Sequence, residues 1–328
     1  MNTSSDLKIE KPNVIQALLS GFNTIASKPY LILLPVLLDL FLWFGPVWRV
    51  DELFGPIIDE LTNLPGLGTP EYAGVLETYQ TFWQDLLNNF NLAKVIHTFP
   101  VGLPSLMVGK PPMANPIGRP VVFSLNTNSQ IGLVLALFLL VGYFLGNLYF
   151  EKISQEVKIK QSGSSAKTVL WSFIQILIMP ILMVVILLVL SLPLLFLMTL
   201  VMMMGQALSQ ILVLMAVMLL LWILMPLIFT PHGIYLYKQN LISAMMTSIS
   251  VVRVSMGRTA WFILISYVMT QGLNYLWQTP GVENWLLIVG IFGHAFVVTA
   301  VLAASFYYFI DATKFTQTVI NQQKAPSN

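Results

Sequence analysis

The feature that most constrains this chain is an uncharged stretch of about 60 residues, from Val169 to Thr230. One helix needs about 20 apolar residues to cross a hydrocarbon core of about 30 Å, so this stretch is long enough for two spans. The polar sequence GQALSQ, Gly205 to Gln210, is the expected break between them. Pro180 and Pro193 leave open a kinked or re-entrant arrangement instead.

Shorter apolar runs elsewhere predict further spans. Apolar residues make up 56% of the 328 residues and charged residues only 9%, far from the roughly 25% charge of a soluble domain. We therefore predict an all-α integral membrane protein with about six transmembrane helices in a single membrane domain, residues 1–328. The four further spans are expected at 30–48, 131–150, 259–277 and 287–310.

The distribution of basic residues predicts the orientation, because lysine and arginine in short loops favour the cytoplasmic side. With the N-terminus inside, twelve of them fall on the inner side and four on the outer side. The inner residues are Lys8, Lys11, Lys28, Lys152, Lys158, Lys160, Lys167, Lys238, Arg253, Arg258, Lys314 and Lys324, and the outer ones are Arg49, Lys94, Lys110 and Arg119. We expect both termini in the cytoplasm, with membrane lipids around the spans and no removable signal peptide.

The composition and motifs argue against several kinds of site. The net charge of +2, without a basic run, gives no support for nucleic-acid binding, and the absence of cysteine removes disulfides and thiolate ligands. The histidines, His97, His232 and His294, have no metal-ligand spacing, and no HExxH, Walker-type or GxSxG motif occurs. We expect no metal, no cofactor and no enzymatic activity.

The longest connection, residues 49–130, follows the first span and is expected outside the cytoplasm. Its apolar residues recur every three or four positions over about 71–93, which predicts a helix. Residues 97–120 contain six prolines, which predict a turn-rich surface loop. Two interpretations stay open for this segment: a lid or docking site for a partner protein, or a cap over the ends of the spans.

Two segments expected on the inner side are similar to each other. NVIQALLSGFN, starting at Asn13, and NLISAMMTSIS, starting at Asn240, share three identities in eleven positions and the same apolar pattern. We predict interfacial amphipathic helices at 13–27 and 240–256, each leading into a span. An internal duplication and a chance likeness of two amphipathic helices both account for the similarity.

The same pattern, an interfacial helix followed by a basic or small-residue turn and a span, carries a resemblance. This pattern is seen in ALLSGFNTIASKPYLILLPVLL and again in NLISAMMTSISVVRVSMGRTAWFILISYVM. Over about 70 residues of the chain, it resembles bacterial multi-pass proteins related to the membrane domain of glycerophosphodiester phosphodiesterases and its uncharacterised relatives. The resemblance implies a prokaryotic cytoplasmic-membrane protein with about six helices. It does not imply phosphodiesterase activity, which in those proteins belongs to a separate soluble domain.

Small residues predict where helices approach each other closely. Gly142 and Gly146 form a GYFLG spacing in the second span, and Gly293 begins a similar stripe in the last span. Such spacing allows two helix backbones to come together within a bundle or a dimer, and it leaves the oligomeric state undetermined.

Asp39 is the one charged residue inside the predicted apolar runs. A carboxylate at mid-membrane costs about 2.5 to 3.5 kcal/mol on insertion scales, so it is expected to face the bundle interior or a wet cavity. The threading puts His294 at a similar depth. Three interpretations of Asp39 stay open. It is a buried acid satisfied by Tyr, Asn or Thr groups, or it forms a proton or cation relay with His294. Otherwise the span is threaded differently and Asp39 lies nearer a membrane interface, or it contacts a partner subunit.

These observations lead to three hypotheses about function. The leading one is a non-enzymatic membrane component, an accessory or organising part of a lipid or envelope process, with a protein partner at the outer segment. The second is a small transporter or permease-like protein with a polar site near Asp39 and His294. The third is an intramembrane enzyme.

Overall fold

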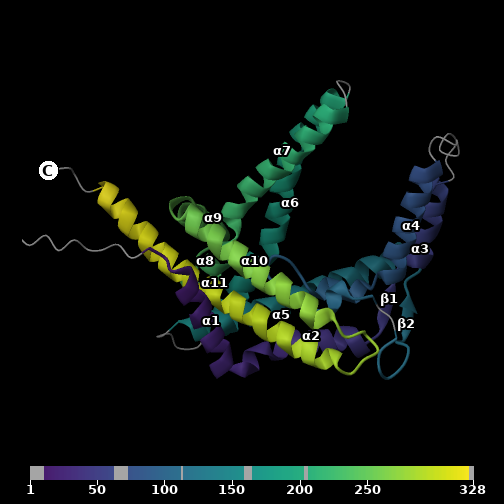
Figure 1. The fold of residues 1–328 in the computed structure, drawn as a ribbon, viewed down its shortest axis with the longest axis horizontal. Helices are drawn as coiled ribbons and strands as arrows, with labels where there is room; N and C mark the ends of the chain where they lie inside the picture. Colours follow the sequence, from purple (N-terminus) through teal and green to yellow (C-terminus); the bar gives the residue numbers. More distant parts are fainter. Residues whose placement is uncertain (1–10, 63–72, 112–113, 159–164, 203–205, 325–328) are drawn as a thin grey trace, which may run out of the picture.

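The computed structural model describes residues 11–62, 73–111, 114–158, 165–202 and 206–324, and most of them are helical (Figure 1). The α-helices are α1 Val14–Ser27, α2 Leu33–Phe44, α3 Asp51–Thr62, α4 Ala73–Asn89, α5 Asn128–Val157, α6 Ala166–Met202, α7 Gln206–Leu224, α8 Thr230–Tyr237, α9 Leu241–Val254, α10 Met256–Gln278 and α11 Leu287–Lys324. Short 3-10 helices lie at η1 Pro29–Ile32, η2 Leu92–Ile96, η3 Met107–Gly109 and η4 Met225–Leu227. The strands β1 Val47–Arg49 and β2 Val122–Ser124 pair in parallel.

Four of the described helices are long and apolar enough to cross a membrane, or up to six if each of two bent pairs counts as one span. The prediction of a helical multi-pass membrane protein is confirmed at that level. Within the long uncharged stretch, α6 ends at Met202 and α7 begins at Gln206, close to the expected break. Pro180 and Pro193 both lie inside α6.

The two bent pairs have the same construction, and we call them the first elbow (α1–α2) and the second elbow (α9–α10). α1 and α9 are each 14 residues long, and the chain turns by 94° after α1 and by 99° after α9. Each begins with an asparagine cap: the side chain of Asn13 accepts the N–H of Gln16 (3.2 Å) and that of Asn240 accepts the N–H of Ser243 (2.8 Å). Both predicted amphipathic segments are therefore helices that lead into an apolar helix.

Both elbows attach to the long helix α11 at the same level. The hydroxyl of Thr24 in the first elbow lies 2.9 Å from the hydroxyl of Tyr307, and the hydroxyl of Thr259 in the second elbow lies 3.0 Å from that of Tyr308. These adjacent tyrosines make α11 the shared support of the two elbows.

Close packing surrounds this part of α11. Gly21 of α1 lies against its backbone, and a Cβ at that glycine would be 2.3 Å from the carbonyl oxygen of Ala300, so any side chain there would force the helices apart. The rings of Phe262 and Tyr308 stack at 4.6 Å between α10 and α11. From the opposite side the buried hydroxyl of Tyr149, on α5, donates to Thr299 at 2.7 Å.

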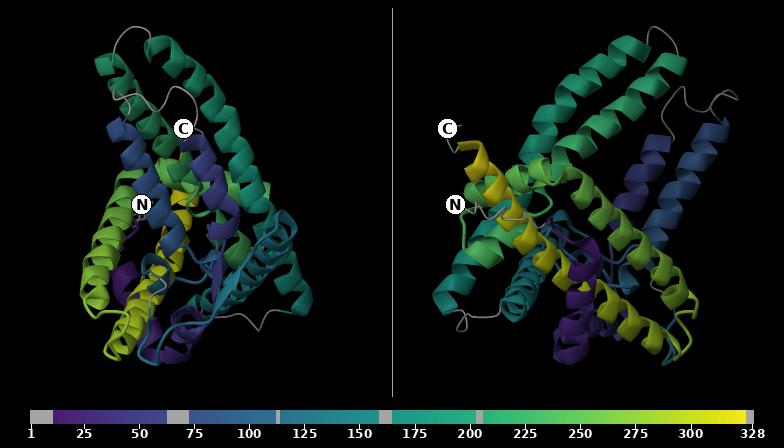
Figure 2. Two further views of the ribbon diagram at one scale, coloured as in Figure 1. Left: turned by 90° about the vertical axis from the view of Figure 1, so that its right-hand side faces the viewer. Right: turned by 60° about the vertical axis from the view of Figure 1, so that its left-hand side comes forward.

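Two helical hairpins project from this body, α6–α7 near the centre of Figure 1 and α3–α4 at its right (Figures 1 and 2). The connection that carries α3–α4 corresponds to the predicted segment 49–130. Its observed helix α4 lies inside the expected range 71–93, whereas α3 was not predicted.

The proline-rich part of this connection differs from the surface loop that the sequence predicts. It is turn-rich as expected, but Val101, Leu103, Leu106 and Met107 are at most 4% exposed. These apolar side chains fill the space between the ends of α2, α5 and the α10–α11 turn, which explains the burial. Residues 101–107 are therefore folded into the core, whereas Phe99 and Ile117 on either side of them are 77% and 74% exposed.

Candidate functional site

Asp39 lies on α2 and is completely buried. Its carboxylate accepts three hydrogen bonds: from the Ser105 hydroxyl (2.5 Å), the Leu106 N–H (3.0 Å) and the Met107 N–H (3.1 Å). Hydrogen bonds to an ionised acceptor are roughly twice as strong as neutral ones, so three of them offset much of the cost of burial. Asp39 thus holds one turn of the connecting segment against α2. We call residues 97–110 the anchored loop.

The local sequence shapes this loop to fit the carboxylate. Ser105 donates to Asp39 and also accepts the N–H of Val108 at 3.2 Å, so one hydroxyl binds both the acid and the backbone of η3. The side chains of Leu106 and Met107 point into the core while their N–H groups face Asp39. Burial of apolar side chains and satisfaction of the acid therefore depend on the same turn.

Two lysines tie the anchored loop to its surroundings. Lys94 donates to the carbonyl of Lys110 (2.8 Å), and Lys110 donates to the carbonyls of Gln278 (2.6 Å) and Pro280 (3.1 Å) in the α10–α11 turn. Burial lowers the pKa of both lysines, because desolvation disfavours the ammonium form. The later half of the loop is thereby fastened to α2 through residues 105–107 and to the end of α10 through Lys110.

The predicted packing glycines of α5 also face this segment. A Cβ at Gly142 would lie 2.4 Å from the carbonyl oxygen of Ile96, and one at Gly146 would lie 2.8 Å from the Cα of Gly102. Close approach is thus required, as predicted, but by a loop backbone in place of a second helix. Gly293 faces α10, where a Cβ would lie 2.7 Å from the Trp277 ring.

The histidines occupy three different environments. His294 on α11 is 9% exposed, and its Nδ1 has no hydrogen-bond partner among the described residues. His97 in the anchored loop is exposed and bonds through Nδ1 to the carbonyl of Leu103. A carbonyl only accepts, so Nδ1 of His97 carries a proton. The Nε2 of His232 lies 2.7 Å from the Ser305 hydroxyl.

The hydrogen bonds of Asp39 all come from residues 105–107, and none in the described part of the chain comes from His294. The relay between these two residues stays a prediction. Nor do the described residues include a group of three or more His, Asp or Glu that could hold a metal ion.

A buried ion pair on the opposite end of the body was missed in the sequence. Both carboxylate oxygens of Glu151, on α5, lie 2.7 Å from the ammonium group of Lys238, and Glu151 is 3% exposed. Lys238 follows α8 in the left-handed conformation, with φ of 53°. The available signal was an acidic residue at the end of an otherwise apolar span, because such a residue needs a partner.

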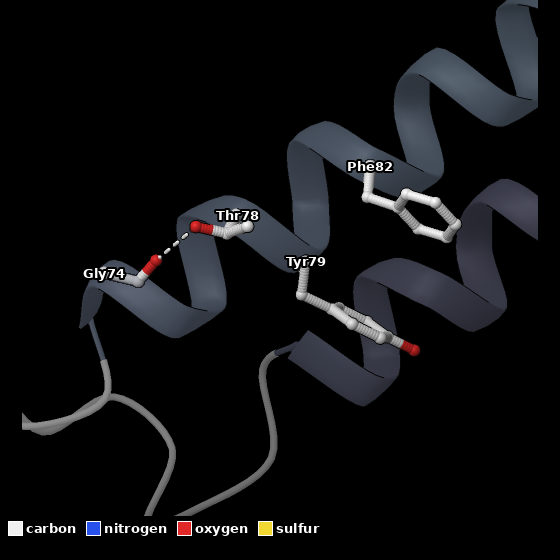
Figure 3. A pocket seen from close by; sticks show the side chains of 4 residues that line it. All are labelled: Gly74, Thr78, Tyr79 and Phe82. Atoms are coloured by element: carbon white, nitrogen blue, oxygen red, sulfur yellow. Dashed lines mark hydrogen bonds between the residues drawn. The ribbon is translucent and has the colours of Figure 1, made fainter. Parts of the chain in front are cut away.

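The α3–α4 hairpin has an open groove on α4 of about 460 Å³, lined by Gly74, Thr78, Tyr79 and Phe82 (Figure 3). The Thr78 hydroxyl donates to the carbonyl of Gly74 at 2.8 Å, which leaves the two rings as the main surface of the groove. Trp83 packs edge-on against both, with ring centroids 5.9 Å from Tyr79 and 5.5 Å from Phe82. The groove is an aromatic surface suited to contact with another apolar group.

Comparison with known proteins gives no match to a family model, to a curated protein or to a solved structure. The resemblance to the membrane domain of glycerophosphodiester phosphodiesterases stays a prediction.

Proposed function

We propose that the protein is a non-enzymatic accessory component of a prokaryotic cytoplasmic membrane, which presents the α3–α4 hairpin to a partner protein outside the cytoplasm. In this arrangement six spans cross the membrane and both termini are cytoplasmic, as the distribution of basic residues favours. α1 and α9 lie along the inner leaflet. Their exposed apolar side chains support this placement: Ile15 and Leu19 on α1, Ile242 and Met246 on α9.

The anchoring of the connecting segment carries the proposal. A buried acid, two lysines and two glycines fix the chain that follows α4 to α2, α5 and the α10–α11 turn. Above this firm base the hairpin stands clear of the body (Figures 1 and 2). A rigid mount with a projecting, partly apolar hairpin is the arrangement expected of a protein that holds a binding element in place.

Crosslinking in native membranes tests the proposal. The full chain is compared with a variant in which residues 51–89 are replaced by a short Gly/Ser linker, and with Phe196→Ala, an exposed position on α6. We expect a stable partner that crosslinks to the full chain and to Phe196→Ala but is lost from the hairpin replacement. A partner retained without the hairpin, or no partner with the full chain, would contradict the proposal.

A second candidate is a small transporter that uses the region of His294. The observation that favours it is the buried Nδ1 of His294, which has no partner in the described part of the chain. Reconstituted protein should then show proton or solute flux that His294→Gln and Asp39→Asn reduce. Flux that is absent, or unchanged in both variants, would rule out this candidate.

A further inference from the structure

The α3–α4 hairpin carries charge of a single sign. Between Val50 and Ala93 the chain has seven acidic residues and no lysine or arginine. The exposed acidic side chains in the described part of the hairpin are Glu52, Glu60, Glu77 and Asp85. None of the ion pairs found among the described residues involves the hairpin. Its negative charge is therefore available to an outside partner.

Apolar side chains are exposed beside these acids. On α3, Phe54 and Ile57 are 41% and 47% exposed and precede Glu60 at three-residue intervals. On α4, Phe82 and Leu86 are 59% and 43% exposed on either side of Asp85. Residues three or four apart on a helix are neighbours, so each helix offers apolar and acidic groups on one face.

We infer that the hairpin docks a cationic amphipathic helix of the partner protein, with apolar side chains in the groove at Tyr79 and Phe82 and basic side chains on the flanking acids. This inference rests on the proposed function and names the chemistry of its partner. An amphipathic helix lying in an apolar groove is a common mode of recognition. Opposite charges along its edges supply specificity and a faster association rate.

The charge decides between this occupant and two others. A second copy of the hairpin would bring seven acidic residues against seven, and a membrane surface rich in anionic lipid would repel it in the same way. Either contact would have to overcome repulsion, whereas a basic helix gains attraction from every exposed acid.

The test uses the purified full chain in nanodiscs and a synthetic amphipathic helix of lysine and leucine as the probe. The controls are a peptide with glutamate in place of lysine, a scrambled lysine–leucine peptide, and vesicles of phosphatidylglycerol. We expect binding of the lysine–leucine helix alone, weaker as NaCl rises from about 0.05 M to about 0.5 M, because salt screens exposed charges. Three results would overturn the inference: equal binding of the scrambled or acidic peptide to the chain, binding of the chain's hairpin to the vesicles, or dimerisation of the chain through the hairpin.

Variants locate the binding. Phe82→Ala should weaken it by about tenfold or more, as expected of an aromatic anchor. The joint change Glu60→Gln, Glu77→Gln and Asp85→Asn should weaken it and remove its salt dependence. The matched control Phe196→Ala, an exposed phenylalanine on α6, should bind normally. Unchanged binding in the first two variants, with unchanged melting temperatures, would overturn the inference.

Native membranes separate failure of the inference from failure of the proposed function. If the crosslinked partner is lost on replacement of residues 51–89 but kept by the three-site neutral variant, the accessory function stands and the cationic helix is wrong. If both variants keep the partner, the accessory function and the cationic helix are both wrong. If both variants lose the partner, both proposals are supported.

Discussion

The two projecting hairpins share a shape and differ in chemistry. No charged residue occurs in α7, and α6 has only Lys167, close to its start. In the most apolar 18-residue stretch of α6, no residue is buried inside the protein. The α3–α4 hairpin is acidic, and its apolar side chains are interspersed with polar ones. Exposed apolar surface on this scale is stable only where lipid covers it, so α6–α7 is suited to the bilayer and α3–α4 to water.

The comparison teaches that the two hairpins are held in place by different forces. The projecting length of α6–α7 is suited to lipid by its apolar side chains alone. Among the described residues, only the base of α6 makes hydrogen bonds to the body: Asn147 donates to the carbonyl of Val169 (3.2 Å) and Gln175 accepts the N–H of Leu241 (2.8 Å). The chain that follows α3–α4 is fixed by particular bonds to Asp39, Lys94 and Lys110. Substitutions should therefore affect the two hairpins in different ways.

The largest effect is expected at the base of the α3–α4 hairpin. Asp39→Leu leaves the Ser105 hydroxyl and two buried N–H groups without an acceptor, which should cost about 3 to 5 kcal/mol of unfolding free energy. Ser105→Ala removes one of these bonds and should cost less. Melting temperature in detergent and the rate of trypsin cleavage after Lys94 measure both. Equal stability of Asp39→Leu and the parent would show that the acid does not anchor the loop.

A somewhat smaller effect is expected from a charge placed on α6. Leu188 is 54% exposed, and Leu188→Asp should disfavour insertion by about 3 kcal/mol if lipid surrounds this helix. Phe82→Asp on α4 should leave insertion unchanged, because the proposed arrangement places that position outside the bilayer. The amount of each variant in the carbonate-washed membrane fraction checks the difference. If Leu188→Asp and Phe82→Asp were lost from the membrane fraction to the same extent, the proposed difference between the two hairpins would be wrong.

The smallest effect is expected from a single methyl group on α5. Gly142→Ala forces a Cβ against the Ile96 carbonyl and should cost about 1 to 3 kcal/mol. The matched control is Gly132→Ala, earlier in the same helix, where nothing lies within 4 Å of the added methyl group. It should be neutral or slightly stabilising, because alanine favours helix over glycine. Thermal unfolding of the two variants separates close approach of the loop from helix propensity, and equal melting temperatures would argue against that approach.

The sequence predicted the helices more fully than it predicted the anchored loop. The span at 131–150, the break near Gly205 and the two asparagine-capped helices have local signals, namely apolar length and helical periodicity. The burial of Val101 and Leu106 has none, because their spacing follows neither helix nor strand and the nearby prolines indicate exposure. The partners of Asp39 were equally hidden, since two are backbone N–H groups and all lie about 66 residues or more away in the chain.

The adjacent tyrosines that bind the two elbows also mark a position along α11 that can be compared with the thickness of a membrane. From Leu287 to Tyr307 the helix rises about 30 Å at 1.5 Å per residue, which equals the thickness of a hydrocarbon core. α1 packs along the second half of this length, from Phe296 to Tyr307, so the proposed arrangement places the headgroup boundary near Tyr307. The remainder of α11, through Lys324, then extends roughly 25 Å past that boundary. A tag fused to this end would stand clear of the bilayer on a rigid stalk.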